Sequence, residues 1–367
     1  MARIDPWGSG QITDYEHVFK EFGLKPFPEK WSSSLKHYLF ERNIVVAHRD
    51  FDLVFQKIKT KKPFVNMTGI ASSGQLHLGH KADLDLFFFF KKSGARNYFS
   101  VSDLDAYLSR PDSSVPSIKK AKQNAVDNLA HALALGLTEK DVYVQSQGSR
   151  KNPRRYFEFS LELSKKITKN TFEAVYGHVD LGKVAANFLQ YADIIHPQLE
   201  EFEGKMPSVT GIGIEQDPHA RLTRDVARRL PYDLEVPSFI YFQHQSGLRE
   251  GSKMSSSLPE TAVFLNDSAK DAERKIRNAF TGGRPTAEEQ KKLGGNPEIC
   301  KVCELLRFHF PDSKKLGKHI EDYRSGKILD RENKQFAVDF MLPWLEKHQE
   351  KAKEKRELAE QIVSGQN

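Results

Sequence analysis

The chain has 367 residues, of which 38% are hydrophobic and 11% aromatic, so it can bury a sizeable core and is long enough for two or three domains. Its formal net charge of +7 modestly favours a polyanionic partner such as a nucleic acid. The two cysteines exclude a disulfide framework. Because no apolar run resembles a signal peptide or could span a bilayer, we expect a cytoplasmic protein with no membrane segment.

Residues 1–60 are predicted to form an extension with little strand character, in which aromatic residues such as Trp7 and Trp31 pack on the body of the protein. The segment from Asp14 to Phe22 has helical spacing, and Thr13 or Asp14 is available as its cap.

Residues 64–80 predict a strand, a tight loop of small residues and the start of a helix. The free N–H groups and the dipole at such a helix N-terminus can hold a phosphate. His77 and His80 lie three residues apart, hence on one face of the first turn. Taken alone, the pair could equally be a surface cluster or part of a metal site.

Beyond this stretch, strands alternate with helices. The pattern predicts strands at Asn97 to Ser102 and Asp141 to Val144, with helices at Ser117 to Leu135 and Arg155 to Lys166. Such alternation is typical of parallel βαβ units in a doubly wound sheet, where ligands bind at the carboxyl ends of the strands. Asp103 and Asp105 follow one strand end and are site candidates, although Asp103 could simply cap a helix.

Two later segments also carry candidate ligand contacts. A helix is predicted from Lys183 to Ile195, with Gln190 and Asp193 on one face, where they could bind a ligand or point to solvent. A glycine-bearing strand from residue 211 ends in Glu215 and Gln216, and a helix follows from Ala220 to Leu230.

The last third is predicted to be helical and basic from about residue 266. It contains Cys300 and Cys303, a spacing that supplies half a zinc site. His309 could add a third ligand, but the better interpretation is two residues of one helix, with no metal bound.

Residues 64–80, with His77-Leu78-Gly79-His80, and residues 251–257, with Lys253-Met254-Ser255-Ser256-Ser257, together resemble the two signature motifs of class I aminoacyl-tRNA synthetases. Residues 215–219, 223–225 and 281–286 and parts of the N-terminal extension are similar to the archaeal and eukaryotic tryptophanyl-tRNA synthetases. The likeness covers essentially the whole chain.

The resemblance implies a Rossmann-like doubly wound parallel sheet, an α/β catalytic domain, followed by an all-α C-terminal domain. Its expected parts are an N-terminal extension (1–60), a catalytic domain (61–265), a helical anticodon-binding domain (266–346) and a C-terminal helix (347–367). The implied activity is ATP-dependent activation of L-tryptophan with Mg²⁺, transfer to its tRNA, and action as a homodimer.

The resemblance also assigns site residues. The catalytic group would be His77, His80, Lys253, Ser255, Ser256 and Ser257. ATP would be bound by Gly69, Ser73, Gly79 and Met254. The amino acid would meet Met67, Ser100, Asp105, Gln190, Asp193, Gly213, Glu215 and Gln216.

Two positions depart from the family pattern. Met67 and Ser100 stand where this branch has a tyrosine and a glutamine that hold the indole N–H. Asp193 is the expected replacement, which keeps a tyrosine–tRNA ligase open as an alternative. A second alternative is an inactive synthetase-like protein that binds RNA.

Overall fold

A computed structural model describes residues 15–178, 180–252, 254 and 258–366 of the chain. Its centre is a seven-stranded sheet with the order β1-β2-β7-β6-β3-β4-β5. The five strands from β7 to β5 are parallel, and β2 and β1 are added antiparallel at one edge. The strands are β1 (Lys25–Pro26), β2 (Val45–Arg49), β3 (Val65–Ala71), β4 (Arg96–Ser102), β5 (Val142–Val144), β6 (Ser208–Gly213) and β7 (Ser238–Phe242).

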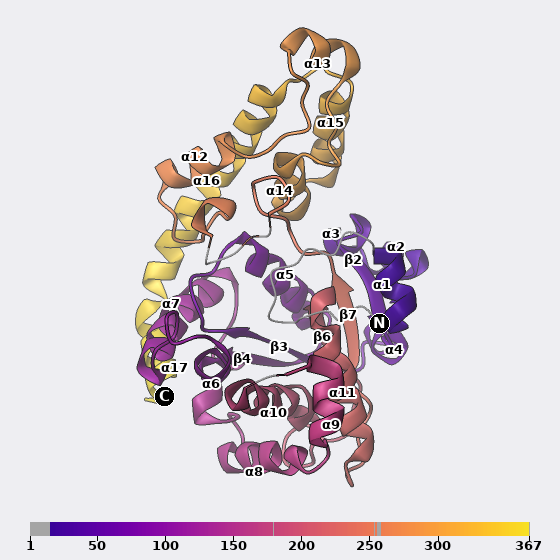
Figure 1. The fold of residues 1–367 in the computed structure, drawn as a ribbon, viewed down its shortest axis with the longest axis vertical. Helices are drawn as coiled ribbons and strands as arrows, with labels where there is room; N and C mark the ends of the chain where they lie inside the picture. The colour runs from indigo at the N-terminus through magenta and orange to yellow at the C-terminus, as the bar shows by residue number, and fades with distance from the viewer. Residues whose placement is uncertain (1–14, 179, 253, 255–257, 367) are drawn as a thin grey trace.

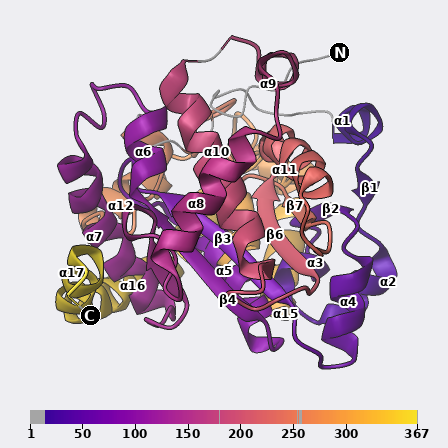
Figure 2. The ribbon, with the colours of Figure 1, turned by 90° about the horizontal axis from the view of Figure 1, so that it is seen from below.

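Helices cover both faces of this sheet, which confirms the doubly wound α/β fold (Figure 1 and Figure 2). Phe99 and Val101 of β4 pack towards α5 and α7, whereas Tyr98, the residue before Phe99, packs with α8 and α10 on the opposite face. This alternation follows from the two-residue period of a strand. The helices of this part are α5 (Leu78–Lys92), α6 (Asp103–Ser109), α7 (Ile118–Leu135), α8 (Pro153–Ser164), α9 (Lys169–Tyr176), α10 (Leu181–Ile195) and α11 (Asp217–Arg229).

Side-chain caps set the N-termini of several helices. Ser117, Thr168 and Asp180 accept hydrogen bonds from backbone N–H groups in the first turns of α7, α9 and α10. The predicted helices at α7, α8 and α10 are therefore confirmed to within two residues at each end, whereas α9 was not predicted.

The N-terminal region contributes more strand than the sequence predicted. Its helices are α1 (Tyr15–Phe22), α2 (Glu29–Leu35), α3 (Tyr38–Glu41) and α4 (Asp52–Lys59). The helix expected from Asp14 is confirmed, and its candidate caps lie outside the described residues. The expectation of little strand character is wrong, because β2 pairs with the edge strand β7. That pairing depends on a partner almost two hundred residues away, which local spacing does not report.

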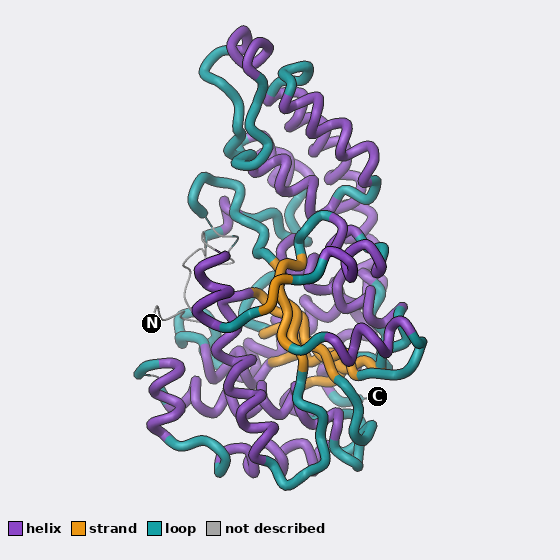
Figure 3. The backbone as a smooth tube through the Cα atoms, turned by 90° about the vertical axis from the view of Figure 1, so that its right-hand side faces the viewer, coloured by secondary structure: helices purple, strands orange, loops and turns teal. Residues whose placement is uncertain are grey.

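The last hundred residues are helical, as expected (Figure 1 and Figure 3). The elements are α12 (Ala269–Arg277), α13 (Ala287–Leu293), α14 (Lys301–His309), α15 (Ser313–Arg324), α16 (Asp330–Glu354) and α17 (Arg356–Ser364). Helix α16 runs from the helical end of the molecule down to the sheet, where α17 lies beside α7. Gln147 donates from its side-chain amide to the Ile362 and Val363 carbonyls, at 3.0 and 2.8 Å, and so holds the end of α17.

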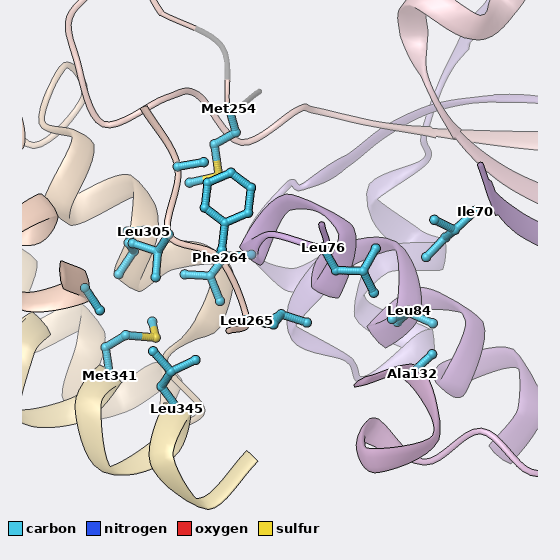
Figure 4. Packing of buried hydrophobic residues seen from close by; sticks show 14 of the residues in the cluster. Ile70, Leu76, Leu84, Ala132, Met254, Phe264, Leu265, Leu305, Met341 and Leu345 are labelled. Atoms are coloured by element: carbon cyan, nitrogen blue, oxygen red, sulfur yellow. The ribbon is translucent and has the colours of Figure 1, made fainter. Parts of the chain in front are cut away.

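The helical region shares one buried cluster with the sheet. Figure 4 shows Leu76 and Phe264 beside Leu305 and Leu345, which belong to α14 and α16. Removing such side chains from a packed core costs about 2–5 kcal/mol each. The two parts therefore stabilise each other, although the sequence divides them near residue 265. In the described part of the chain, no helix is long and apolar enough to cross a membrane.

Candidate active site

A cavity of about 340 Å³ opens at the carboxyl ends of β3 and β6. These two strands are neighbours, but the chain leaves them in opposite directions along the sheet, from β3 towards β4 and from β6 towards β7. Doubly wound folds bind ligands at such a switch point. The lining includes most of the predicted site residues: Met67, Gly69, His77, Gly79, His80, Asp105, Gln190, Asp193, Gly213, Glu215, Gln216 and Met254.

Two predicted residues are not in this lining. Ser100 is fully buried, and its hydroxyl accepts a hydrogen bond from Ser102 at 3.0 Å. It therefore lies behind the cavity wall, and a Cβ at Gly69 would come within 2.9 Å of it. Ser73 also lies outside the lining. Lys253, Ser255, Ser256 and Ser257 lie outside the described residues.

The first turn of α5 fixes both predicted imidazoles. His77 is the N-cap, and its Nδ1 accepts from the Gly79 N–H at 3.2 Å. The Nδ1 of His80 accepts from the His77 N–H at 3.1 Å, which completes a capping box. Because both Nδ1 atoms accept, each neutral ring carries its proton on Nε2. The two rings, with centroids 4.0 Å apart, thus supply N–H groups to the cavity beside the helix N-terminus.

Gly79 and Met254 shape the part of the cavity beside the His77 ring. A Cβ at Gly79 would lie 2.9 Å from the His77 ring and 3.9 Å from the Met254 sulfur. A side chain at Gly79 would therefore push the His77 ring out of place. Met254 itself is 4% exposed and packs near Phe264 (Figure 4). Met254 thus packs into the core next to the start of α5.

Asp193 lies on α10 at the other end of the cavity and is held by three donors. The Tyr143 and Tyr156 hydroxyls donate to its Oδ1 at 2.7 and 2.6 Å, and the Gln145 amide donates to Oδ2 at 2.9 Å. Burial raises the pKa of Asp193 to about 7, against the opposing effect of these donors. Its carboxyl group is thus held rigidly, and a hydrogen bond with the Ser100 side chain acts in the same direction as the three donors.

Asp193 shares a face of α10 with Gln190, as the sequence predicted, but its surroundings differ from those that the sequence suggested. Gln190 lines the cavity with it, one helical turn away, so both residues face the cavity. The sequence did not predict its three donors. Tyr143 lies in β5, Gln145 directly follows that strand, and Tyr156 lies on α8. The signal available in the sequence was the polar residue Gln145 at a strand end.

The side chains of Asp103 and Asp105, the two aspartates after β4, lie in different surroundings. Asp103 is buried and accepts from the Ser146 N–H at 2.9 Å and the Ser146 hydroxyl, so it connects β4 to the turn after β5. Asp105 lines the cavity, and burial raises its pKa. The oxygens of Asp103 are therefore used within the fold, whereas Asp105 is a candidate for ligand contact.

A second acidic group lies where β6 meets α5. Glu215 receives a hydrogen bond from His244 and another from the Gln216 amide at 3.3 Å. Asp83 also lines the cavity, and burial raises its pKa to about 7, with Glu215 contributing in the same direction and His244 opposing. A Cβ at Gly213 would come within 2.2 Å of His244 Nε2, so a larger residue there would displace the His244 and Glu215 side chains. Neither Asp83 nor His244 was predicted from the sequence.

The start of α11 contains a structural carboxylate and a cavity histidine. Asp217 is fully buried and accepts from Arg49 at 2.9 Å and from the Tyr241 hydroxyl at 2.7 Å, which ties α11 to β2 and β7. His219 lines the cavity, and the Tyr176 hydroxyl lies 2.7 Å from its Nδ1. Burial lowers the pKa of His219 to about 3, so the ring is neutral.

Comparison with known proteins agrees with this site. A family model for class I tRNA synthetases (W and Y) matches residues 59–342. The curated tryptophan–tRNA ligase of Aeropyrum pernix is 36% identical and covers 98% of both chains, and that of Methanocaldococcus jannaschii is 36% identical, covering 100% of this chain and 99% of its own.

Solved structures agree as well. The Aeropyrum pernix tryptophanyl-tRNA synthetase superposes with a TM-score of 0.86 at 35% identity, covering 98% of each chain. The Encephalitozoon cuniculi enzyme, solved bound to tryptophan, gives 0.82 at 25% identity, covering 96% of this chain and 99% of its own. The chain therefore belongs to the class I tRNA synthetases, and within them to the tryptophan–tRNA ligases.

Proposed function

We propose that the cavity binds ATP and tryptophan together, with the phosphates at the N-terminus of α5 and the indole ring beside Asp193. The chain activates tryptophan with ATP and transfers it to tRNA, as its family does. What the family does not give is the assignment of this chain's own residues. The single observation that carries our assignment of these residues is the position of Asp193, whose carboxylate lines the cavity and is held by three donors.

At the phosphate end, His77 and His80 donate from Nε2 to phosphate oxygens. The helix N-terminus adds partial positive charge in the same place. Gly79 lets the phosphates approach the backbone of the first turn. Lys253 neutralises charge on the α-phosphate and the departing pyrophosphate, and Ser255, Ser256 and Ser257 belong to the same catalytic group. Preorganised donors of this kind account for much of the rate in such reactions.

The first step is an in-line displacement at the α-phosphorus. A carboxylate oxygen of tryptophan forms the new P–O bond, and the bond to pyrophosphate breaks, leaving tryptophanyl-adenylate. In the second step, a ribose hydroxyl of the tRNA attacks the tryptophanyl carbonyl and AMP leaves. The carboxylate is already a nucleophile, so the protein has to position and stabilise charge rather than remove a proton.

Mg²⁺ accompanies ATP and neutralises its phosphates. Within the described residues, no three His, Cys, Asp or Glu side chains are grouped to hold a metal. Mg²⁺ commonly binds through substrate phosphates and one or two carboxylates, a mode that this donor set fits. Asp83 and Glu215, which line the cavity near α5, are the carboxylates available for it.

At the amino acid end, Gln190 and Asp105 bind the α-amino group. Both line the cavity, and a carboxylate suits an ammonium group. Gly213, Glu215 and Gln216 form the wall between the two substrates. Met67 packs on the indole ring, and its sulfur lies 3.9 Å from the Tyr143 hydroxyl that holds Asp193. Asp193 Oδ2 accepts the indole N–H.

Three further assignments belong to the same proposal. The helical region, residues 266–346, binds the anticodon part of the tRNA, since it is basic and lies beyond the cavity. The enzyme works as a homodimer, and it works in the cytoplasm. Ser73 and Ser100 lie outside the cavity lining. In this proposal Ser73 supports the loop after β3, and Ser100 packs behind Gly69 in the cavity wall.

The test is ATP–pyrophosphate exchange with tryptophan, tyrosine, phenylalanine and the tryptophan analogue in which sulfur replaces the ring N–H. The wild type should reject phenylalanine by roughly 10⁴-fold, because a buried acceptor would lose its partner. Asp193→Ala should lose most tryptophan activity and accept the sulfur analogue nearly as well as tryptophan. An analogue penalty that is equal in wild type and variant would refute the Asp193 assignment, and a wild-type preference for tyrosine would refute the substrate.

A further inference from the structure

The helical region holds a pair of thiols that the synthetase reaction does not use. Cys300 and Cys303 are the two cysteines of the sequence. Both are free and buried, with exposures of 0% and 2%. Cys300 is the N-cap of α14, and Cys303 follows one turn later. Neither residue lines the active-site cavity.

Several donors converge on the Cys300 sulfur. The Cys303 N–H points to it at 3.5 Å, and the Asn333 side-chain amide does so at 3.4 Å. Donation from the Cys303 thiol is the main cause that lowers the pKa of Cys300, and backbone N–H groups including that of Gly282 add to it. The pKa of Cys303 is raised correspondingly, because its proton is shared with Cys300. Cys300 is therefore the more acidic thiol of the pair, and Cys303 is the donor to it.

Asn333 is oriented to serve this pair. It lies on α16, is fully buried and also donates to the Cys303 sulfur at 3.5 Å. Its oxygen lies 2.9 Å from His319 Nε2, which acts as the donor to that oxygen. The amide NH₂ must then face the sulfurs. A buried asparagine aimed at two sulfur atoms is a costly arrangement unless those atoms accept well.

His309, which the spacing left open as a third zinc ligand, is not grouped with the two cysteines. His309 Nε2 lies 2.7 Å from the Gln245 side-chain oxygen, in the segment after β7. In the part of the chain that the structure describes, no third ligand is grouped with the two cysteines.

We propose that Cys300 and Cys303 are a redox-active dithiol that closes to an intramolecular disulfide. The arrangement has the parts that such chemistry needs: a thiolate at a helix N-terminus, a second thiol one turn away, and fixed donors around the reacting sulfur. The oxidant class is a small peroxide, which a buried site admits more readily than a bulky disulfide.

The reaction balances in two steps. The Cys300 thiolate attacks one oxygen of hydrogen peroxide, the O–O bond breaks, and after proton uptake Cys300 is a sulfenic acid and one water has left. The Cys303 sulfur then attacks the Cys300 sulfur, the S–O bond breaks and a second water leaves. Two thiols are oxidised by two electrons in total, and one peroxide is reduced to two waters.

The disulfide would act on the loop that follows α12. In the reduced protein, the Gly282 N–H contributes to the Cys300 thiolate, and the Thr281 hydroxyl and the Tyr323 hydroxyl both donate to Asp330 beside it. Closing the S–S bond removes a negative charge and an acceptor from this network. The effect falls on the helical region and not on the cavity.

The first test uses the full-length protein treated with hydrogen peroxide, then unfolded, alkylated and weighed by mass spectrometry. We expect the wild type to lose both alkylation sites together with two hydrogen atoms, and to recover them with dithiothreitol. Cys303→Ser should leave a sulfenic acid on Cys300 that dimedone traps, whereas Cys300→Ser should trap nothing. Unmodified thiols in the wild type, or trapping on Cys303 instead, would overturn the proposal.

The second test is the pH profile of the peroxide reaction. An ordinary thiol with a pKa of about 8.5 gains roughly 50-fold in rate from pH 6.5 to 8.5. The wild type should gain less than about threefold, and Asn333→Ala, which removes one of the donors to the Cys300 sulfur, should gain more than the wild type. Asn278→Ala, an exposed asparagine at the end of α12, is the matched control and should leave the profile flat. A steep wild-type profile would contradict a Cys300 thiolate.

Discussion

At the residue scale, similar side chains perform different work according to what surrounds them. Asp103 and Asp217 lie at strand ends within recognisable motifs, but their oxygens are taken by Ser146 and by Arg49 and Tyr241. Asp105 and Asp193 lie equally close to strand ends or helix faces and do reach the cavity. A motif therefore predicts where polar groups gather, and the neighbours determine which of them meet a ligand.

Lys253→Ala tests the transition-state part of the site. Because the lysine would act on charge that develops at the α-phosphate, adenylate formation should slow by about 30- to 900-fold, equivalent to roughly 2–4 kcal/mol. Tryptophan affinity should barely change. Pyrophosphate exchange gives the rate, and equilibrium binding gives the affinity.

Lys270→Ala, at an exposed lysine in the first turn of α12, is the matched control. It should leave both quantities as in the wild type. Near-normal exchange in Lys253→Ala would show that another group neutralises the phosphates.

At the element scale, α16 connects the helical region to the part of the molecule that contains the catalytic sheet. Its Trp344 stacks on His348 with centroids 5.2 Å apart, and Lys81 of α5 lies 5.6 Å from the Trp344 ring. His348 Nε2 is 2.9 Å from Nδ1 of His131 on α7. These contacts join α16 to the helix that carries His80, one residue before Lys81.

The His131–His348 pair should make stability sensitive to acid. Burial lowers the pKa of His131 to about 4 and that of His348 to about 3, with Lys81 and Lys351 adding to the effect on His348 and Asp127 opposing it at His131. The unfolded chain binds these protons near pH 6.5. The contribution is thus complete above about pH 6.5 and is lost as the pH falls towards 4, by on the order of 1–3 kcal/mol.

Urea unfolding at pH 7.5 and at pH 4.5 measures this effect. His131→Asn should reduce the difference between the two pH values, whereas His178→Asn, at an exposed histidine, should not. An equal acid loss in wild type and His131→Asn would place the sensitivity elsewhere in the chain.

At the scale of the whole molecule, the helical and catalytic parts cannot be separated cleanly. Leu305, Met341 and Leu345 pack in the same cluster as Leu76 and Phe264 (Figure 4). Excising residues 268–345 would cut α16 and expose that cluster. The proposed tRNA contact is therefore better tested by surface charge reversal, which leaves the core intact.

Lys314→Glu with Lys318→Glu, both exposed on α15, should weaken tRNA charging at least tenfold and leave tryptophan-dependent pyrophosphate exchange unchanged. A surface that neutralises fewer phosphates releases fewer counterions on binding, so the slope of tRNA affinity against salt should become shallower. Lys165→Glu, exposed at the end of α8, is the control and lies far from α15 in Figure 1. Unaltered charging by the double variant would remove α15 from the tRNA surface.

The sequence by itself determined the α/β class, the helical last third and the stretch in which His77 and His80 cap a helix. These features depend on neighbours within a few residues, through the strand and helix periods and the capping pattern. Only the tertiary structure decided that β2 joins the sheet, that Ser100 lies behind the cavity wall, and that α16 belongs to both parts of the molecule. It also decided that Asp193 is held by Tyr143, Gln145 and Tyr156. These contacts of Asp193 join residues that lie 37 to 50 positions apart in the sequence. Their geometry depends on how whole elements pack rather than on local spacing.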